Sequence, residues 1–360
     1  MTRRIALCLP GGGANGALFQ IGAVSALEDT IEGFDGSSFD LYVASSGGAS
    51  VAAALANGLP VQRLYRAFVD PADVYFGLER KHLLRIDLGE WRRALPSLFG
   101  AMREAAGGLV ALGTGVPSAA LWQELDRLYD ALPAGIFTLE GYEKFLEDFF
   151  VRRGIPNNFF ALPKPLRILA HDLDSAEPTV FGAGGFDSVP IARACIASMA
   201  IPPLFSPVAV GERSFINPGA GQVVHLDVAM REGATVLVVV NPMVPMQLAD
   251  PAPSLRGEAP RARGMPWIVN QAIRIGATRG IREQCRRAEA SGAASVLLIE
   301  PEPEQSVMFV SNPSSHEARR RVLEYAYRRT RAVLASSEDA LGRAGLTLRP
   351  PRSEVPRSRV

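Results

Sequence analysis

Residues 5–16, IALCLPGGGANG, place a short apolar run directly before three consecutive glycines. The run is too short for a buried helix and suits a strand that is covered on both faces. Residues 17–29 (ALFQIGAVSALED) follow with apolar side chains at helical spacing. The chain therefore opens with a strand, a glycine loop and a helix.

The same order returns at residues 40–49, DLYVASSGGA, where a second apolar run ends in two serines and two glycines. The small residues of 49–58 (ASVAAALANG) then predict a second helix. Strand, turn and helix in repeated order are typical of parallel sheets. We therefore predict an α/β fold with a mainly parallel central sheet flanked by helices.

The rest of the chain divides by composition. Residues 60–163 carry Leu, Arg and aromatic residues broken by Pro and Gly, with no convincing strand, which predicts a helical insertion over the sheet. Strand signals return later, most clearly in the β-branched run 234–240 (ATVLVVV). The expected organisation is a main domain over 5–245, a loop or linker over 246–266, a further strand and helices of the same domain over 267–345, and an unfolded tail over 346–360.

Composition excludes several classes of protein. The 38 Lys and Arg residues nearly balance the 37 Asp and Glu residues, so nucleic acid is not an expected partner. Cys8, Cys195 and Cys285 lie far apart in the sequence, which favours neither a disulfide framework nor a zinc site. The N-terminal apolar run, residues 5–9, is shorter than a signal-peptide core, and no run of the chain reaches the length of a membrane span. We expect a cytoplasmic protein, with peripheral membrane contact as an option and the oligomeric state open.

The glycine loop, Gly11–Gly16, permits several interpretations. Its spacing satisfies the G-x-G-x-x-G pattern of dinucleotide-binding proteins, but Ser45-Ser46 stand where an acidic residue should hold the ribose. A phosphate-binding P-loop needs Lys and then Ser or Thr, and Ala17-Leu18 follow instead. An oxyanion hole needs only backbone N–H groups and fits the loop. A tight structural turn is the remaining alternative.

Ser46 lies between a strand and a helix with small residues on both sides. This is the setting of the nucleophile elbow G-x-S-x-G, in which a sharp turn exposes the serine oxygen. Ala44 replaces the first glycine, a modest departure because alanine has the next smallest side chain. Taken alone, such a turn is more often structural than catalytic.

Together, the glycine loop and the serine turn resemble the patatin-like phospholipase family, including its bacterial acyl hydrolases. The resemblance extends to residues 166–186, similar to a strand and hairpin of that family, and to 194–207 (ACIASMAIPPLFSP), similar to its Ala-Ser-x-Ala-x-Pro segment. Residues 215–219 (FINPG) stand where the family has Asp-Gly-Gly or Asp-Gly-Ala. The resemblance covers residues 5–242 and implies a three-layer sandwich.

The resemblance also implies site residues, because the family uses a Ser-Asp dyad and a glycine-loop oxyanion hole. Ser46 takes the place of the nucleophile and Asn217 that of the dyad aspartate. The implied oxyanion donors are the backbone N–H groups of the glycine loop, with one more suggested by elbow geometry: Gly11, Gly12, Gly13 and Gly47.

Asn217 departs from the family in a way that matters chemically, since an amide cannot accept the serine proton. His225 is the nearest substitute base in sequence, although it equally suits a hydrogen bond within a turn. Asp172 and Asp174 are more distant options, and Asp227 suits the first turn of a helix.

Three functions remain open. The first is a lipid acyl hydrolase or esterase, slowed by Asn217; the others are a disabled family member that binds acyl chains, and an acyltransferase that uses Ser46. The substrate in each case is a lipid or acyl ester, and no cofactor or metal is expected. Apolar residues of the insertion are candidates to roof an acyl pocket: Leu78, Leu83, Leu84, Trp91, Leu98 and Phe99.

Overall fold

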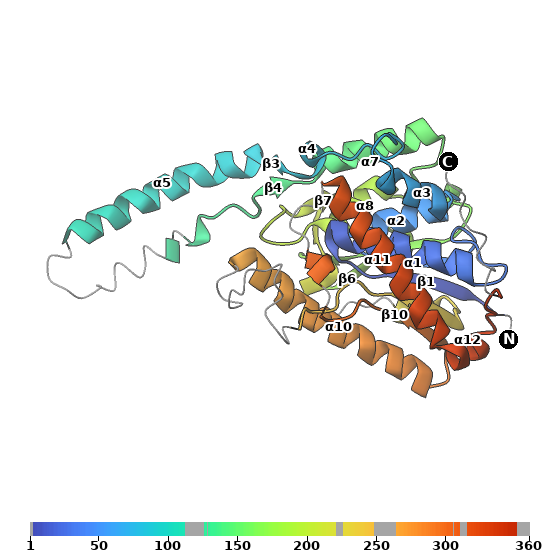
Figure 1. The fold of residues 1–360 in the computed structure, drawn as a ribbon. Coiled ribbons are helices and arrows are strands. Elements are labelled where there is room, and N and C mark those ends of the chain that lie inside the picture. Colours follow the sequence, from blue (N-terminus) through green and yellow to red (C-terminus); the bar gives the residue numbers. More distant parts are fainter. Residues whose placement is uncertain are drawn as a thin grey trace.

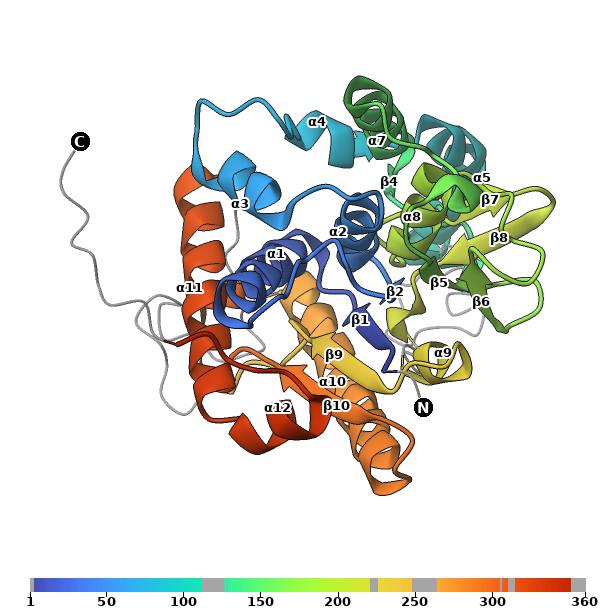
Figure 2. The same cartoon turned by 90° about the vertical axis from the view of Figure 1, so that its right-hand side faces the viewer.

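The computed structural model of the protein describes residues 3–111, 126–127, 129–220, 226–247, 264–304, 306–309 and 315–350. Within them, a mixed sheet lies between two layers of helices (Figures 1 and 2). The mainly parallel sheet and the three-layer arrangement expected from the sequence are confirmed.

The parallel part of the sheet holds the two strands that carry the motifs. Strands β10, β9, β1, β2 and β5 run parallel in that spatial order, β6 and β8 each pair antiparallel with β5, and β7 pairs antiparallel with β8. The strands of the sheet are β1 (Ile5–Leu9), β2 (Leu41–Ala44), β5 (Leu166–Asp172), β6 (Pro178–Phe181), β7 (Val208–Val210), β8 (Arg213–Ile216), β9 (Val236–Val240) and β10 (Ser295–Ile299).

Side-chain alternation along the strands builds a core on each face of the sheet. Leu7 and Leu9 belong to one cluster of buried residues, while Ala6 and Cys8 belong to another. The first cluster includes residues of α1, α2, α8 and α11, and the second includes residues of α9 and α10. Strand β9 is buried along its whole length because β10 and β1 flank it.

The helices follow the strands in the order expected for parallel connections. Helix α1 packs against both α2 and α11, and Figure 2 shows α1 and α2 on the opposite side of the strands from α9. The helices of these layers are α1 (Gly13–Thr30), α2 (Gly47–Ala56), α3 (Val61–Val69), α7 (Glu140–Arg153), α8 (Ile191–Met199), α9 (Leu226–Arg231), α10 (Met265–Ala290), α11 (His316–Ala335) and α12 (Glu338–Ala344).

The insertion differs from the sequence prediction in two ways. It contains a short antiparallel pair, β3 (Arg85–Ile86) with β4 (Phe137–Thr138), where we expected no strand. Its short helix α4 (Arg80–Leu83) packs near α7, but α5 (Leu88–Ala111) runs away from the body instead of lying over the sheet (Figure 1). Two-residue strands leave no alternation that sequence reasoning could detect.

Residues 346–350, which we expected to belong to an unfolded tail, pack against the domain. Leu346 is buried, and Leu348 forms an antiparallel bridge with Ile31 at the end of α1. The Arg349 N–H donates to Thr30 O over 2.8 Å. The expectation was therefore wrong for residues 346–350, and residues 351–360 lie outside the described part of the chain.

Candidate active site

Ser46 stands at the sharp turn between β2 and α2. Its backbone has φ 54° and ψ −133°, an uncommon conformation for a residue with a side chain. It precedes the first residue of α2, so the helix N-terminus, where N–H groups lack intrahelical partners, begins beside its hydroxyl. This is the strained geometry that a nucleophile elbow requires.

Close backbone contacts explain why glycines follow Ser46. A Cβ at Gly47 would lie 2.3 Å from Gly13 O, and one at Gly48 would lie 2.2 Å from Leu9 O. Both distances are far below van der Waals contact. The turn can therefore approach the first strand and the glycine loop only with glycine at these two positions.

Gly48→Ala should lower the free energy of unfolding by about 1–3 kcal/mol, because the new methyl group meets a backbone carbonyl that cannot rotate away. Urea denaturation measures this change. The control is Gly276→Ala in α10, where a Cβ would have nothing within 4 Å. Equal stability of the two variants would contradict the claim that the turn has no room for a side chain at Gly48.

The glycine loop faces the serine directly. A Cβ at Gly11 would lie 3.1 Å from Ser46 Cβ and 3.6 Å from Ser46 Oγ. Gly12 and Gly13 have positive φ angles of 133° and 61°, and α1 begins at Gly13. The N-termini of α1 and α2 thus converge beside Ser46, and both ends favour negative charge.

Ser198, at the end of α8, holds the serine turn to the sheet. Its Oγ accepts a hydrogen bond from Ser46 N (2.7 Å) and donates one to Leu169 O of β5 (2.5 Å). Ser198 is fully buried, so water does not compete for these bonds. The backbone of the elbow is therefore fixed by a side chain from another element.

Asn217, which follows β8, uses both ends of its side-chain amide. Its Nδ2 donates to Ser198 O (2.6 Å), and its Oδ1 accepts from Gly219 N (2.7 Å). One partner is an acceptor and the other a donor, so the amide orientation is determined. Asn217 is 5% exposed and, with Ser198, belongs to the network that supports the elbow.

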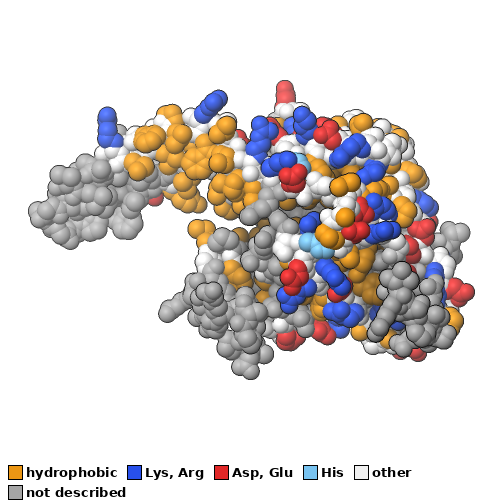
Figure 3. Space-filling view, turned by 45° about the horizontal axis from the view of Figure 1, so that its top comes forward, with side chains coloured by type: hydrophobic (Ala, Val, Ile, Leu, Met, Phe, Trp, Pro, Cys, Tyr) orange, Lys and Arg blue, Asp and Glu red, His pale blue; other side chains and the backbone are white. Residues whose placement is uncertain are grey.

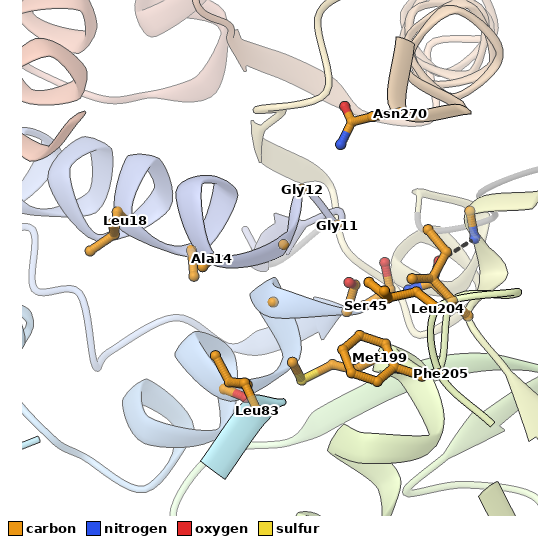
Figure 4. A pocket seen from close by; sticks show the side chains of 18 of the residues that line it. Gly11, Gly12, Ala14, Leu18, Ser45, Leu83, Met199, Leu204, Phe205 and Asn270 are labelled. Atoms are coloured by element: carbon orange, nitrogen blue, oxygen red, sulfur yellow. Dashed lines mark hydrogen bonds between the residues drawn. The ribbon is translucent and has the colours of Figure 1, made fainter. Parts of the chain in front are cut away.

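A cavity of about 730 Å³ opens in front of Ser46, a volume typical of small-molecule sites. Ser46, Asn217 and the glycine loop line one part of it, and most of the other lining side chains are apolar. In Figure 4, Met199, Phe205 and Leu83 lie on the far side of Ser45 from Asn270 of α10. The site therefore places Ser46 at the wall of a mostly apolar cavity.

The insertion contributes part of the cavity roof. Leu78, Leu83 and Leu84 line the cavity as expected. Trp91, Leu98 and Phe99 were also candidates, but they are not among its lining residues, because α5 runs outward.

Three of the substitute bases considered from the sequence lie outside the lining of the cavity. Asp172 binds Arg213 Nη1 (3.0 Å) and lies outside the cavity lining, as do Asp174 and Asp227. Burial opposes ionisation of Asp172, but hydrogen bonds from Asp174, Ser175 and Arg213 outweigh it and lower its pKa. His225 lies outside the described residues.

Within the described chain, no group of three or more His, Cys, Asp or Glu side chains is placed to hold a metal ion. The same residues contain no helix that is both long and apolar enough to span a membrane.

Sequence reasoning missed two residues of this region. Ser198 belongs to the family-like segment 194–207, but nothing in the segment alone indicates that its hydroxyl binds the serine turn. Arg274 lines the same cavity from α10, where no local motif marks it. Both roles depend on contacts between residues far apart in the chain.

The family described as patatin-like phospholipase matches residues 7–229. No curated protein matches the chain significantly. Among solved structures, VipD from Legionella pneumophila is 15% identical, with 93% of this chain and 67% of that chain covered and a TM-score of 0.38.

Two further structures are similar at the same level. ExoU, a type III effector from Pseudomonas aeruginosa, is 16% identical over 92% of this chain and 53% of its own, with a TM-score of 0.38. Human GIVD cytosolic phospholipase A2, in complex with methyl gamma-linolenyl fluorophosphonate, is 12% identical over 95% and 59%, with a TM-score of 0.35. The chain thus spans about half to two thirds of the length of these proteins. Because the family match covers more than half of its residues, the chain belongs to the patatin-like phospholipase family.

Proposed function

We propose that this protein is a lipid acyl hydrolase in which Ser46 attacks the ester carbonyl. The observation that carries the proposal is the strained turn at Ser46, which faces the glycine loop at one wall of an apolar cavity. Family membership supports the same activity. The apolar lining favours an acyl chain over a polar substrate.

The proposed reaction has two halves. Ser46 Oγ bonds to the carbonyl carbon as its proton passes to a water molecule, and the electron pair of the C=O bond moves to the oxygen, where N–H groups of Gly12, Gly13 and Gly47 stabilise it. The C=O bond then re-forms and expels the alcohol, which takes up the proton carried by that water, and an acyl-serine remains. A second water hydrolyses this ester and releases the fatty acid.

Loss of the serine proton is the slow part of this scheme. Asn217 offers no basic atom, and Glu79 is the one carboxylate among the described residues that line the cavity. Glu79 is 3.0 Å from Lys81 Nζ in an exposed ion pair, which suits it poorly as a base. A positioned base contributes about 10²–10⁴ to a rate, so turnover should be slower than in a Ser-Asp enzyme by roughly that factor.

A fluorophosphonate probe with an alkyl chain tests the proposal, because it phosphonylates an activated serine without needing the true substrate. Intact mass should show one adduct on the wild type and on Ser45→Ala, and none on Ser46→Ala. Ser45 is the matched control because it is the adjacent serine. Labelling that persists in Ser46→Ala would refute the assignment.

A second function is favoured by Asn217 itself. Its amide hydrogen bonds hold the loop after β8 and support the elbow. These bonds give the side chain a structural role that needs no catalytic one. The alternative is a protein that binds acyl chains in the cavity without cleaving them. Probe labelling of Ser46 rejects this alternative, whereas tight binding of a fatty acid with no labelling supports it.

We also propose that the protein takes its substrate from a membrane, through the outer face of α5. Leu88, Leu95, Phe99 and Met102 are all exposed, and at about 100° per residue they form one stripe roughly 60° wide. Two exposed arginines, Arg92 and Arg103, lie along one edge of the stripe. Apolar residues beside basic ones are typical of helices that lie in an anionic lipid surface.

The mouth of the cavity is apolar as well. Four exposed apolar side chains also line the cavity: Leu84, Ile136, Leu204 and Met265. Figure 3 shows apolar side chains gathered on α5, which extends from the body of the protein, and blue basic side chains at its edge. A lipid could therefore pass from the bilayer into the cavity along an apolar path.

Phe99→Glu should weaken binding to vesicles of phosphatidylcholine and phosphatidylglycerol by about tenfold or more, since a buried Phe contributes roughly 1.5–3 kcal/mol. Co-sedimentation measures the bound fraction. Phe160→Glu is the control, because Phe160 is 74% exposed, compared with 66% for Phe99, and lies outside α5. Similar losses in both variants would argue against a specific docking face.

A further inference from the structure

Arg274 of α10 is a buried cation in the wall of the Ser46 cavity. It is 2% exposed, and burial lowers the pKa of its guanidinium to about 10, so it remains charged at neutral pH. Within the described chain, no carboxylate forms an ion pair with it. A buried charge without a counterion is costly, so its presence calls for an explanation.

The protein satisfies only part of the guanidinium. Nη1 donates to Pro242 O (2.8 Å) and Val244 O (3.2 Å), and Nε donates to Asn270 Oδ1 (2.6 Å). The ring of Phe309 covers one face, with its centroid 4.5 Å from Cζ. No hydrogen bond joins Nη2 to a described residue. The fixed bonds hold the group rigidly while Nη2 remains available.

Arg274 is also close to the reaction centre. Pro242, whose carbonyl it binds, packs on the glycine loop, since a Cβ at Gly12 would lie 2.8 Å from Pro242 Cγ. Ile273, the preceding residue, lies beside Gly219, the hydrogen-bond partner of Asn217. Asn270, one turn earlier, faces the glycine loop in Figure 4. The cation therefore belongs to the part of the cavity wall that adjoins the glycine loop and Gly219.

We propose that Arg274 binds an anionic oxygen of the lipid, so that the cavity selects acyl chains linked to a phosphate or carboxylate over neutral acylglycerols. This inference rests on the proposed function and names the substrate class of that site. The free Nη2 can donate a charge-assisted hydrogen bond inside a cavity of low polarity, where such bonds are strong. Arg274 lies in α10, outside residues 7–229, which match the family.

The test is binding to Ser46→Ala, in which turnover does not interfere. The ligands are monomeric dihexanoyl phosphatidylglycerol, neutral dihexanoylglycerol, hexanoate and inorganic phosphate, each titrated by calorimetry. Dihexanoyl phosphatidylglycerol should bind at least tenfold more tightly than dihexanoylglycerol. Adding Arg274→Gln should weaken the anionic lipid by about 10–100-fold and leave the neutral lipid unchanged.

Two controls separate charge recognition from structural support. Arg282→Gln removes a cation of the same helix that pairs with Glu300 on the surface, and should change neither affinity. Arg274→Lys keeps the charge without the planar fork, and should retain part of the preference for anions. If Arg274→Gln weakens the binding of hexanoate as much as that of the phospholipid, a carboxylate is a second source of the anion.

Each outcome bears on a different claim. Equal weakening of the anionic and neutral lipids by Arg274→Gln would overturn the anion site and leave the hydrolase proposal intact. The anion site would also be overturned if Arg274→Gln changed no affinity. It would likewise be overturned if only inorganic phosphate lost affinity in Arg274→Gln. Failure of both lipids to bind Ser46→Ala would overturn the lipid cavity itself.

Discussion

Ser46→Ala should lower the rate of ester cleavage by about 10³-fold or more, because the covalent path is lost and only direct attack by water in the cavity remains. Release of p-nitrophenol from p-nitrophenyl octanoate measures the rate. The remaining slow reaction reflects the oxyanion donors and substrate binding, which persist when a nucleophile is removed.

Ser45→Ala is the control for this prediction. Ser45 is 2% exposed and adjacent in sequence, so a merely structural effect of altering the turn should appear in both variants. We expect Ser45→Ala to keep a rate near that of the wild type. Cleavage that survives in Ser46→Ala would place the chemistry on another residue.

Asn217→Asp should destabilise the protein increasingly as the pH rises, by about 2–4 kcal/mol at pH 8. The substitution places a carboxylate oxygen where Nδ2 now donates to Ser198 O over 2.6 Å. Two oxygens at that distance repel each other unless the new carboxyl is protonated. Its pKa in the folded protein should therefore rise above the value of about 3.9 in the unfolded chain.

The sign of the pH dependence follows from proton binding. Between the two pKa values the folded variant holds a proton that the unfolded chain has lost, so stability falls as the pH increases. Below about pH 4 the protonated carboxyl donates to Ser198 O as the amide does, and the variant should approach the wild type. Urea denaturation at several pH values measures the difference.

Asn158→Asp is the matched control, because Asn158 is exposed and its Oδ1 accepts from Ala161 N as a helix cap. A carboxylate serves this role as well, so no such loss is expected. A stable Asn217→Asp with a rate raised by about 10² would show that the site accepts a dyad aspartate, contrary to our interpretation of Asn217.

Local signals were sufficient to predict the centre of the fold. The apolar runs before Gly11 and Ser45 predict strands, and these became β1 and β2, paired in parallel from Ala6 with Leu41 to Leu9 with Ala44. Each run ends in small residues, where a tight turn leads directly into a helix. Sequence and structure agree here because the signals lie within a few residues of each other.

Other features depended on distant contacts. The β3–β4 pair joins segments about fifty residues apart, and Leu348 is ordered because it meets Ile31. The position of Asn217 could be predicted from the family resemblance, but its bonds to Ser198 and Gly219 could not. His225 stays a prediction.

The most direct test of the central claim is to trap the acyl-serine. Wild type mixed with p-nitrophenyl octanoate and quenched in acid should show one added octanoyl group by intact mass, mapped by peptide fragmentation to Ser46. The good p-nitrophenolate leaving group speeds acylation of this ester, so deacylation, which also has no base at residue 217, becomes the slower step and this species should accumulate. Continued turnover with no adduct, or an adduct on another residue, would contradict the account.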